Sequence, residues 1–246
     1  MHILVTRPEE DAEDLKTRLE RLGHRITLAP LVSIELNAIP LSAIEHATAL
    51  IATSRNALRA LAGSPALRLA TTLPLFVVGP GTAATALEMG FQDVFEGAGT
   101  ASDLVPTIIR KWREDGGLYI YLAGDVQAFD LKSALASAGV NIALVTAYRS
   151  VAAETLPDEV ISALQSRDID AVILMSPKTA ETWVRLTAAL SPAPDLSGLT
   201  YLCISQSVAD AVSKRHDAKR ILTATNPNLE EMLALIKRLA PHSKAE

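Results

Sequence analysis

Short apolar runs of strand length alternate with helix-length segments along the whole chain. Ten such runs occur: ILVTR, ITLAP, ATALIATS, LPLFVVG, DVFEG, GLYIYLAG, NIALVTAY, DAVILMS, TYLCIS and RILTAT. The first segment between them, EEDAEDLKTRLERLG, has Leu15, Leu19 and Leu22 at helical spacing and ends with Gly23, a typical helix stop. This alternation predicts an α/β fold whose parallel strands are covered by helices on both faces.

Distant parts of the chain share this pattern at a nearly constant offset. The pattern that begins at Asp14 matches one that begins at Asp130, an offset of 116 residues. Ser54 aligns with Ser176 at an offset of 122, and Thr82 aligns with Ser207 at an offset of 125. Self-similarity over such distances predicts two copies of one α/β unit.

The order of the two copies predicts an inserted domain. The strand-helix-strand unit at the start of the chain corresponds to the unit near residues 118–148, which ends the other copy. We therefore expect a discontinuous domain of residues 1–35 and 151–246, with a second domain of residues 38–148 inserted into it. The fold class predicted is two similar doubly wound parallel-sheet domains, flavodoxin-like, joined by a two-strand extended hinge. The crossings LVSIELNAIP and YRSVAAETLP would form this hinge and let the domains open and close over a ligand.

Composition excludes several classes of partner. The chain has 246 residues and is 49% hydrophobic, so it can bury a sizeable core. The net charge is −5, aromatic residues make up 4%, and no Lys/Arg-rich run is present, so we expect no nucleic-acid partner. No apolar stretch reaches membrane-spanning length, and no basic segment precedes the first apolar run. We therefore expect a cytoplasmic protein with no membrane partner.

Cysteine and histidine usage gives no sign of a redox or metal centre. Cys203 is the single cysteine and lies in the apolar run TYLCIS, so we expect a small buried side chain rather than a nucleophile. The five histidines are scattered without ligand spacing, and no metal site is predicted. They are His2, His24, His46, His216 and His242.

Small polar residues follow several strands, at the edge where parallel sheets bind ligands and helix N-termini expose N–H groups. They are Thr6-Arg7-Pro8, Thr53-Ser54-Arg55-Asn56, Gly79-Pro80-Gly81-Thr82, Gly124-Asp125, Ser176-Pro177-Lys178-Thr179 and Ser205-Gln206-Ser207. Two facing domains with such turns would make a cleft for several carboxylates. Each turn also has a purely structural interpretation, because Ser, Thr and Asn before a helix are N-caps by default. Tyr148, at the end of a strand, could likewise pack its ring at a sheet edge.

Several motifs occur in a fixed order along nearly the whole chain. They are ILVTRPEEDAEDLKTRLERLG, ALIATSRNALRAL, FVVGPGTAATALEMGF, LAGD, TAYR, DAVILMSPKTAETW and CISQSVADAV. Together they resemble the uroporphyrinogen-III synthase family. The chain departs from the family after Gly124-Asp125, where an arginine is often found, and at Ser205-Gln206-Ser207, where Gly-Pro-Thr is common.

The resemblance implies an enzyme that acts on hydroxymethylbilane, a linear tetrapyrrole with acetate and propionate arms. The implied reaction is a dehydrative ring closure that inverts ring D, in tetrapyrrole biosynthesis, by a monomer that needs no cofactor. Tyr148 is implied as the proton donor to the departing hydroxyl. The implied substrate-binding residues are Thr6, Arg7, Ser54, Arg55, Gly79, Gly81, Thr82, Ala83, Gly124, Ser176, Lys178, Ser205, Gln206 and Ser207.

Two other functions fit the residues. A two-domain binding protein or regulator would use the same hinge and turns to hold an anionic metabolite without chemistry. A different small-molecule enzyme on the same scaffold is the other alternative, because a fold does not fix a reaction.

Overall fold

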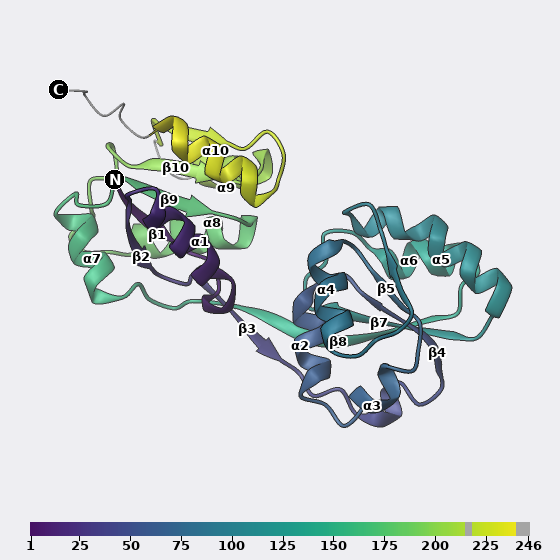
Figure 1. Ribbon diagram of the computed structural model, residues 1–246. Coiled ribbons are helices and arrows are strands. Elements are labelled where there is room, and N and C mark those ends of the chain that lie inside the picture. Colours follow the sequence, from purple (N-terminus) through teal and green to yellow (C-terminus); the bar gives the residue numbers. More distant parts are fainter. Residues whose placement is uncertain (215–217, 240–246) are drawn as a thin grey trace. The chain divides into compact units, whose positions relative to one another are not determined.

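The computed structural model describes residues 1–214 and 218–239, and within them the chain forms two compact units (Figure 1). Unit 1 combines Met1–Ser33 with the chain from Val151 onward, and unit 2 is Ile34–Ser150. The described residues contain eleven strands, ten α-helices and one short 3₁₀ helix. None of the helices in this described part is both long and apolar enough to cross a membrane.

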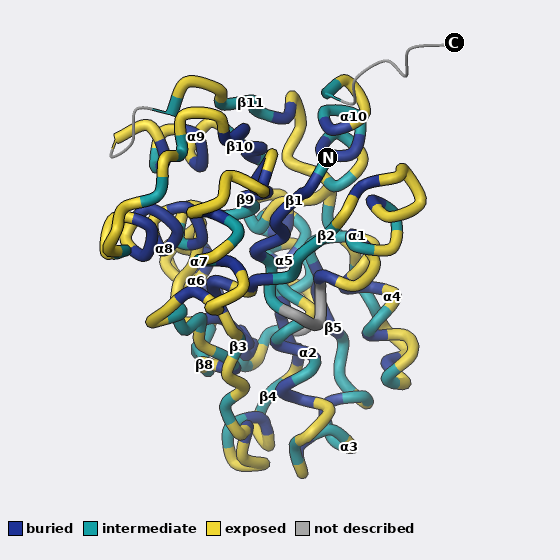
Figure 2. Tube along the Cα trace, turned by 90° about the vertical axis from the view of Figure 1, so that its left-hand side faces the viewer, coloured by how far each residue is buried: buried dark blue, intermediate teal, exposed yellow. Residues whose placement is uncertain are grey.

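Unit 1 is built on a five-stranded parallel sheet in the order β11-β10-β9-β1-β2. The strands are β1 (His2–Val5), β2 (Arg25–Leu28), β9 (Ala171–Leu174), β10 (Thr200–Cys203) and β11 (Ile221–Thr223). Every residue of β1, β9 and β10 is buried, as Figure 2 shows by the dark tube along the inner strands. Strands buried on both faces explain why the sequence shows continuous apolar runs here rather than alternation.

Helices cover both faces of the unit 1 sheet (Figure 1). One face carries α1 (Glu9–Arg21) and α10 (Leu229–Leu239). The other carries α7 (Asp158–Gln165), α8 (Pro177–Ala188) and α9 (Gln206–Ser213), with Trp183 as the largest buried side chain. After α1 the chain turns at Gly23, whose φ of 81° is the left-handed conformation that glycine adopts without strain.

Unit 2 holds a six-stranded sheet in the order β3-β8-β7-β4-β5-β6, and the strands from β4 to β8 are parallel. The strands are β3 (Val32–Leu36), β4 (Ala47–Ala52), β5 (Leu75–Val77), β6 (Val94–Glu96), β7 (Leu118–Gly124) and β8 (Ile142–Ala152). The turn η1 (Leu41–Ala43) precedes β4. One face is covered by α2 (Arg55–Ala62), α3 (Leu67–Ala70) and α4 (Pro80–Glu88), and the other by α5 (Ala101–Asp115) and α6 (Leu131–Ser137).

The two sheets have the same spatial arrangement of strands, but the chain begins at a different strand in each. In unit 1 the spatial order is β2-β1-β9-β10-β11, and in unit 2 the matching order is β8-β7-β4-β5-β6. The pair β1 and β2 thus takes the place of β7 and β8, as the internal repeat predicts. The predicted α/β class with two parallel sheets is confirmed, and each of the ten predicted runs overlaps a strand.

The crossing segments are themselves strands. β3 and β8 are neighbours in the sheet of unit 2, and each continues into unit 1, at residues 33–34 and 150–151. The pairing extends beyond the sheet, because the N–H of Ala153 donates to the carbonyl of Leu31 at 2.9 Å. The two connections between the units therefore run side by side.

One predicted alignment is wrong by a single residue. The sequence comparison aligns Thr82 with Ser207, whereas the helix starts at Gly79 and Ser205 differ by 126 positions. At that offset Ser207 takes the place of Gly81, and the buried Val208 takes the place of the buried Thr82. The mismatch arises because the end of the preceding strand, rather than hydroxyl content, determines where each helix begins.

Candidate functional site

The predicted polar turns lie at helix N-termini, and two of their serines are caps. Ser54 Oγ accepts a hydrogen bond from the N–H of Asn56 at 3.2 Å at the start of α2. Ser176 Oγ accepts one from the N–H of Thr179 at 3.1 Å at the start of α8. The structural interpretation thus applies to both hydroxyls. Capping uses the acceptor capacity of a hydroxyl and leaves the proton of Ser54 available to a ligand, whereas Ser176 Oγ also lies 2.8 Å from Thr179 Oγ1.

The α8–α9 pocket is a hollow of about 620 Å³ in unit 1. Two predicted residues, Lys178 and Ser207, line it, and Arg185 and Lys214 add two more cations against one carboxylate, Glu181. The excess of positive charge suits an anionic ligand, because ammonium and guanidinium groups form short, strong hydrogen bonds with carboxylates. The described lining also includes Ala152, Pro177, Thr182, Val184 and Ala211.

The hydroxyls at the start of α9 lie next to each other in unit 1. Ser205 Oγ and Ser207 Oγ are 2.9 Å apart, and Ser207 reaches the α8–α9 pocket. Gln206 points its amide elsewhere, donating to Asp210 Oδ1 at 2.8 Å within the same helix. Of the three residues at this turn, Ser207 is therefore the one placed to meet a ligand, with Ser205 beside it.

The Tyr148 pocket is a second hollow, of about 640 Å³, at the carboxyl end of the sheet in unit 2. Its described lining contains no Lys, Arg, His, Asp or Glu. Five hydroxyl side chains and one amide supply its polarity: Thr53, Thr100, Ser102, Tyr121, Tyr148 and Gln127. Val126 and Phe129 are 67% and 37% exposed, so apolar surface is available for a flat ring.

Gly124 and Tyr148, both predicted site residues, meet in the Tyr148 pocket. They are register partners on β7 and β8, at a point where the pairing register shifts. A Cβ built on Gly124 would lie 2.7 Å from Cζ of Tyr148, closer than real contacts allow. Position 124 must therefore be glycine for the tyrosine ring to lie across the end of β7.

The remaining predicted residues line neither pocket. Thr6 is fully buried, and its hydroxyl donates to the carbonyl of Ile173 at 2.6 Å, which ties β1 to β9. At the start of α4, the N–H groups of Thr82 and Ala83 both donate to the carbonyl of Gly79 at 3.1 Å, so these amides already have an acceptor. The others outside both linings are Arg7, Ser54, Arg55, Gly79, Gly81, Ser176, Ser205 and Gln206.

Sequence reasoning missed several lining residues, of which Tyr121 is the clearest case. Tyr121 lies inside the run GLYIYLAG, where an aromatic residue is typical of a buried strand. Its hydroxyl nevertheless lies 3.0 Å from Thr53 Oγ1 at the pocket wall. Burial raises the pKa of Tyr121; the Thr53 hydrogen bond opposes this, and the nearby Tyr148 and Asp130 raise the pKa further. Arg185 and Lys214 were missed because Arg185 lies in the last turn of α8 and Lys214 just after α9, both away from the turns that begin these helices.

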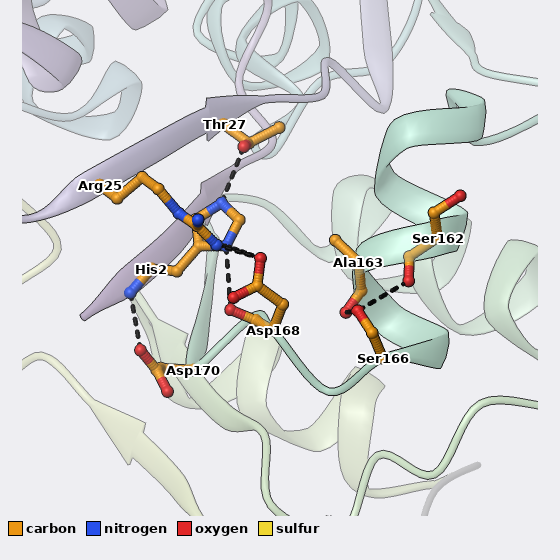
Figure 3. Close-up of polar contacts among 8 residues, drawn as sticks. All are labelled: His2, Arg25, Thr27, Ser162, Ala163, Ser166, Asp168 and Asp170. Atoms are coloured by element: carbon orange, nitrogen blue, oxygen red, sulfur yellow. Dashed lines mark hydrogen bonds and ion pairs between the residues drawn. The ribbon is translucent and has the colours of Figure 1, made fainter.

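A second polar cluster lies at the opposite, amino edge of the unit 1 sheet (Figure 3). His2 Nε2 is 2.8 Å from Thr27 Oγ1, and His2 Nδ1 is 2.9 Å from the carbonyl of Asp168. The backbone N–H of His2 donates to Asp170 at 2.7 Å, and Arg25 is paired with Asp168. The Arg25 hydrogen bond is the main cause that lowers the pKa of Asp168. These mutual contacts join the starts of β1, β2 and β9, which is a structural role.

The described residues contain no group of three or more His, Cys, Asp or Glu side chains placed to hold a metal ion. His216 and His242 lie outside the described residues.

The fold and its pockets define a class: two-unit α/β proteins built on parallel sheets, the kind of fold in which ligands bind at the carboxyl ends of the strands. The family model for uroporphyrinogen-III synthase HemD matches residues 13–234, so the chain belongs to the uroporphyrinogen-III synthase family. Its reaction is the cyclisation of hydroxymethylbilane to uroporphyrinogen III, a lyase reaction of porphyrin biosynthesis. The match confirms the reaction inferred from the motif order, and it does not favour the binding-protein alternative.

Solved structures show the same fold. Uroporphyrinogen-III synthetase from Helicobacter pylori 26695 is 18% identical, with 97% of this chain and 99% of that chain covered and a TM-score of 0.69. A mutant uroporphyrinogen III synthase from the extremely thermophilic bacterium Thermus thermophilus is 20% identical, with 97% and 98% covered and a TM-score of 0.55. A comparison with curated protein sequences gives no significant match.

Proposed function

We propose that this chain carries out the cyclisation with Tyr148 as the acid that protonates the departing hydroxyl of ring A. The observation that carries the proposal is the position of the Tyr148 ring, packed against Gly124 in a pocket whose described lining has no charged side chain. A phenol held in this position can donate its proton to the substrate, and a positioned acid speeds a proton transfer by about 10²- to 10⁴-fold.

In the proposed course Tyr148 transfers its proton to the hydroxyl, directly or through water, while the C–O bond lengthens. The C–O bond breaks, water leaves, and ring A becomes an electrophilic azafulvene. The substituted α-carbon of ring D then forms a C–C bond to it, giving a spiro intermediate that fragments and recombines at the other α-position. That carbon loses a proton, which restores the phenol, so no net acid is consumed. The Tyr148 pocket would favour the rearranging attack over simple closure by holding rings A and D in one orientation.

We propose that the α8–α9 pocket binds carboxylate arms of the bilane. Lys178 and Lys214 supply charge, and Ser207 supplies a directional hydroxyl. Arg185 is held against the backbone, donating to the carbonyl of Ala153, so its guanidinium needs little reordering when an anion arrives. Ser205 and Ser176 would support this site from the helix starts.

We propose that the two units are separate domains, residues 1–35 with 151–246 and residues 38–148, which open and close about β3 and β8. Two adjacent strand connections limit the motion to a hinge. Substrate-dependent protection of these strands in hydrogen exchange would support the proposal, and unchanged exchange on substrate binding would contradict it.

A Tyr148→Phe enzyme tests the acid role. It keeps the ring over Gly124 and loses the proton, so we expect the turnover number to fall about 100-fold or more. The assay supplies freshly generated hydroxymethylbilane and analyses the product isomers after oxidation. The matched control is Tyr201→Phe, a buried tyrosine of unit 1 that lines neither proposed site. Full turnover by Tyr148→Phe would remove the acid role.

Lys178→Met and Lys214→Met test the carboxylate site. A charge-assisted hydrogen bond contributes about 1.5–3 kcal/mol, so we expect each variant to raise KM about tenfold while kcat changes little. Added salt should weaken substrate binding by the wild type more than by the variants, because dissolved ions screen the attraction between lysine and carboxylate that the variants lack. Lys237→Met, on α10, is the control. Equal KM values for all four proteins would exclude this site.

We further propose that the enzyme works as a monomer in the cytoplasm. The described lining of each pocket comes from one unit of one chain, so neither pocket requires a second copy. Sedimentation at working concentration should give a mass near 26.2 kDa, and a dimer would contradict the proposal. Fractionation of the source cells tests the location.

A further inference from the structure

Tyr121 extends from the core of unit 2 to the wall of the Tyr148 pocket. Its side chain is 2% exposed, and its ring packs with Ile51, Tyr119 and Ala123 on the face covered by α5 and α6. A phenylalanine would fill this place equally well. The hydroxyl therefore stands out: it reaches the carboxyl end of the sheet and meets Thr53 Oγ1 at 3.0 Å.

The Thr53–Tyr121 pair has one proton to spare. Each hydroxyl can donate one hydrogen bond, and their mutual contact uses one of the two protons. The other proton is free to be donated into the pocket that both residues line. The pocket also contains the hydroxyl of Tyr148, which is close enough to raise the pKa of Tyr121. Because burial acts in the same direction, Tyr121 keeps its proton over the working pH range.

We propose that Tyr121, oriented by Thr53, donates a second hydrogen bond to the departing oxygen of ring A, beside the proton delivered by Tyr148. This role rests on the proposed function of the Tyr148 pocket. As the C–O bond lengthens, negative charge grows on that oxygen, which has lone pairs for two donors. A fixed donor in a pocket without charged side chains stabilises the growing charge more than the ground state does. Tyr121 is thus a catalytic residue, and Thr53 is a positioning residue.

Tyr121→Phe keeps the ring and removes the donor, so we expect kcat to fall about 100-fold with little change in KM, the effect typical of losing one such donor. Thr53→Val should lower kcat about tenfold, because the phenol keeps its proton and loses its fixed direction. Thr53→Ser should restore most of the activity. The matched control is Tyr119→Phe, on the same strand and the same face but outside the pocket lining, which should leave kcat unchanged.

A bilane with an aminomethyl group in place of the hydroxymethyl group separates this role from a structural one. The amine is already protonated near neutral pH and departs as ammonia without a proton donor. We expect Tyr121→Phe to slow the hydroxymethyl substrate far more than the aminomethyl substrate. Equal slowing of both, or wild-type turnover by Tyr121→Phe, would overturn the proposal. Wild-type turnover by Tyr148→Phe would instead refute Tyr148 as the acid. The comparison of the two substrates would still test Tyr121, because it does not depend on which group delivers the proton.

Discussion

Cys203 shows how burial determines the chemistry of one side chain. It lies in β10 with no exposed surface, and burial raises the pKa of its thiol to about 12. The reactive thiolate is thus nearly absent at neutral pH. We predict that the native protein will not react with a thiol reagent at pH 8, and that one equivalent will react after denaturation. Rapid labelling of the native protein would contradict the burial.

His24 makes stability depend on pH. Its ring is buried, Nδ1 has no hydrogen-bond partner in the described structure, and burial, followed by the charged N-terminus, lowers its pKa below the ordinary 6.5. As pH falls below about 6.5, the unfolded state binds a proton before the folded state does, so stability is present above that pH and is lost on acidification. We predict that the melting temperature falls less between pH 7.5 and 5 in His24→Gln than in the wild type.

The control for His24 is His46→Gln, because the His46 side chain is 83% exposed. This variant should retain the wild-type dependence of melting temperature on pH. An identical dependence in His24→Gln would show that protonation of His24 does not affect stability.

At the scale of elements, the end of β7 determines where Tyr148 lies. A methyl group at position 124 would enter the Tyr148 ring, so Gly124→Ala must displace the ring. We predict that Gly124→Ala lowers kcat about as much as Tyr148→Phe does, and that the double variant is no slower than either single one. A double-mutant cycle measures this coupling. Losses that multiply in the double variant would show that Gly124 acts independently of the ring.

The strands could be predicted because buried parallel strands leave continuous apolar runs in the sequence. The sequence predicts β3 only as an extended crossing, since the run LVSIEL alternates and does not show that it pairs with β8. Tyr148 and Gly124 are both predicted site residues, and the structure adds their contact. Tyr121 is not among the predicted residues, because nothing in a strand sequence tells a core tyrosine from one whose hydroxyl reaches a pocket.

At the scale of the whole molecule, each unit has its own core. Buried clusters cover both faces of each sheet, and the chain passes between the units at two neighbouring strands. We predict that residues 30–153 fold alone, with cooperative urea unfolding and the circular dichroism of an α/β protein. Residues 1–33 joined to 151–246 by a short glycine linker should fold likewise. A fragment without a cooperative transition would contradict this independence.

The sequence predicts a discontinuous arrangement because a repeat whose copies begin at different points needs an insertion. The pockets could not be predicted. The cations of the α8–α9 pocket meet only because α8 packs beside α9, and a sequence does not show which turns of two helices face each other.

The insertion of unit 2 within unit 1 also determines which unit bears a force applied to the two ends of the chain. A force applied at Met1 and Leu239 stretches unit 1, whereas unit 2 is attached through β3 and β8, which are held together by pairing between Leu31 and Ala153. Unit 2 therefore bears no force as long as unit 1 stays folded. When the two ends of the chain are pulled apart in an optical trap, the molecule should lengthen in two steps. Unit 1 should unfold first, because no force acts on unit 2 until unit 1 has unfolded.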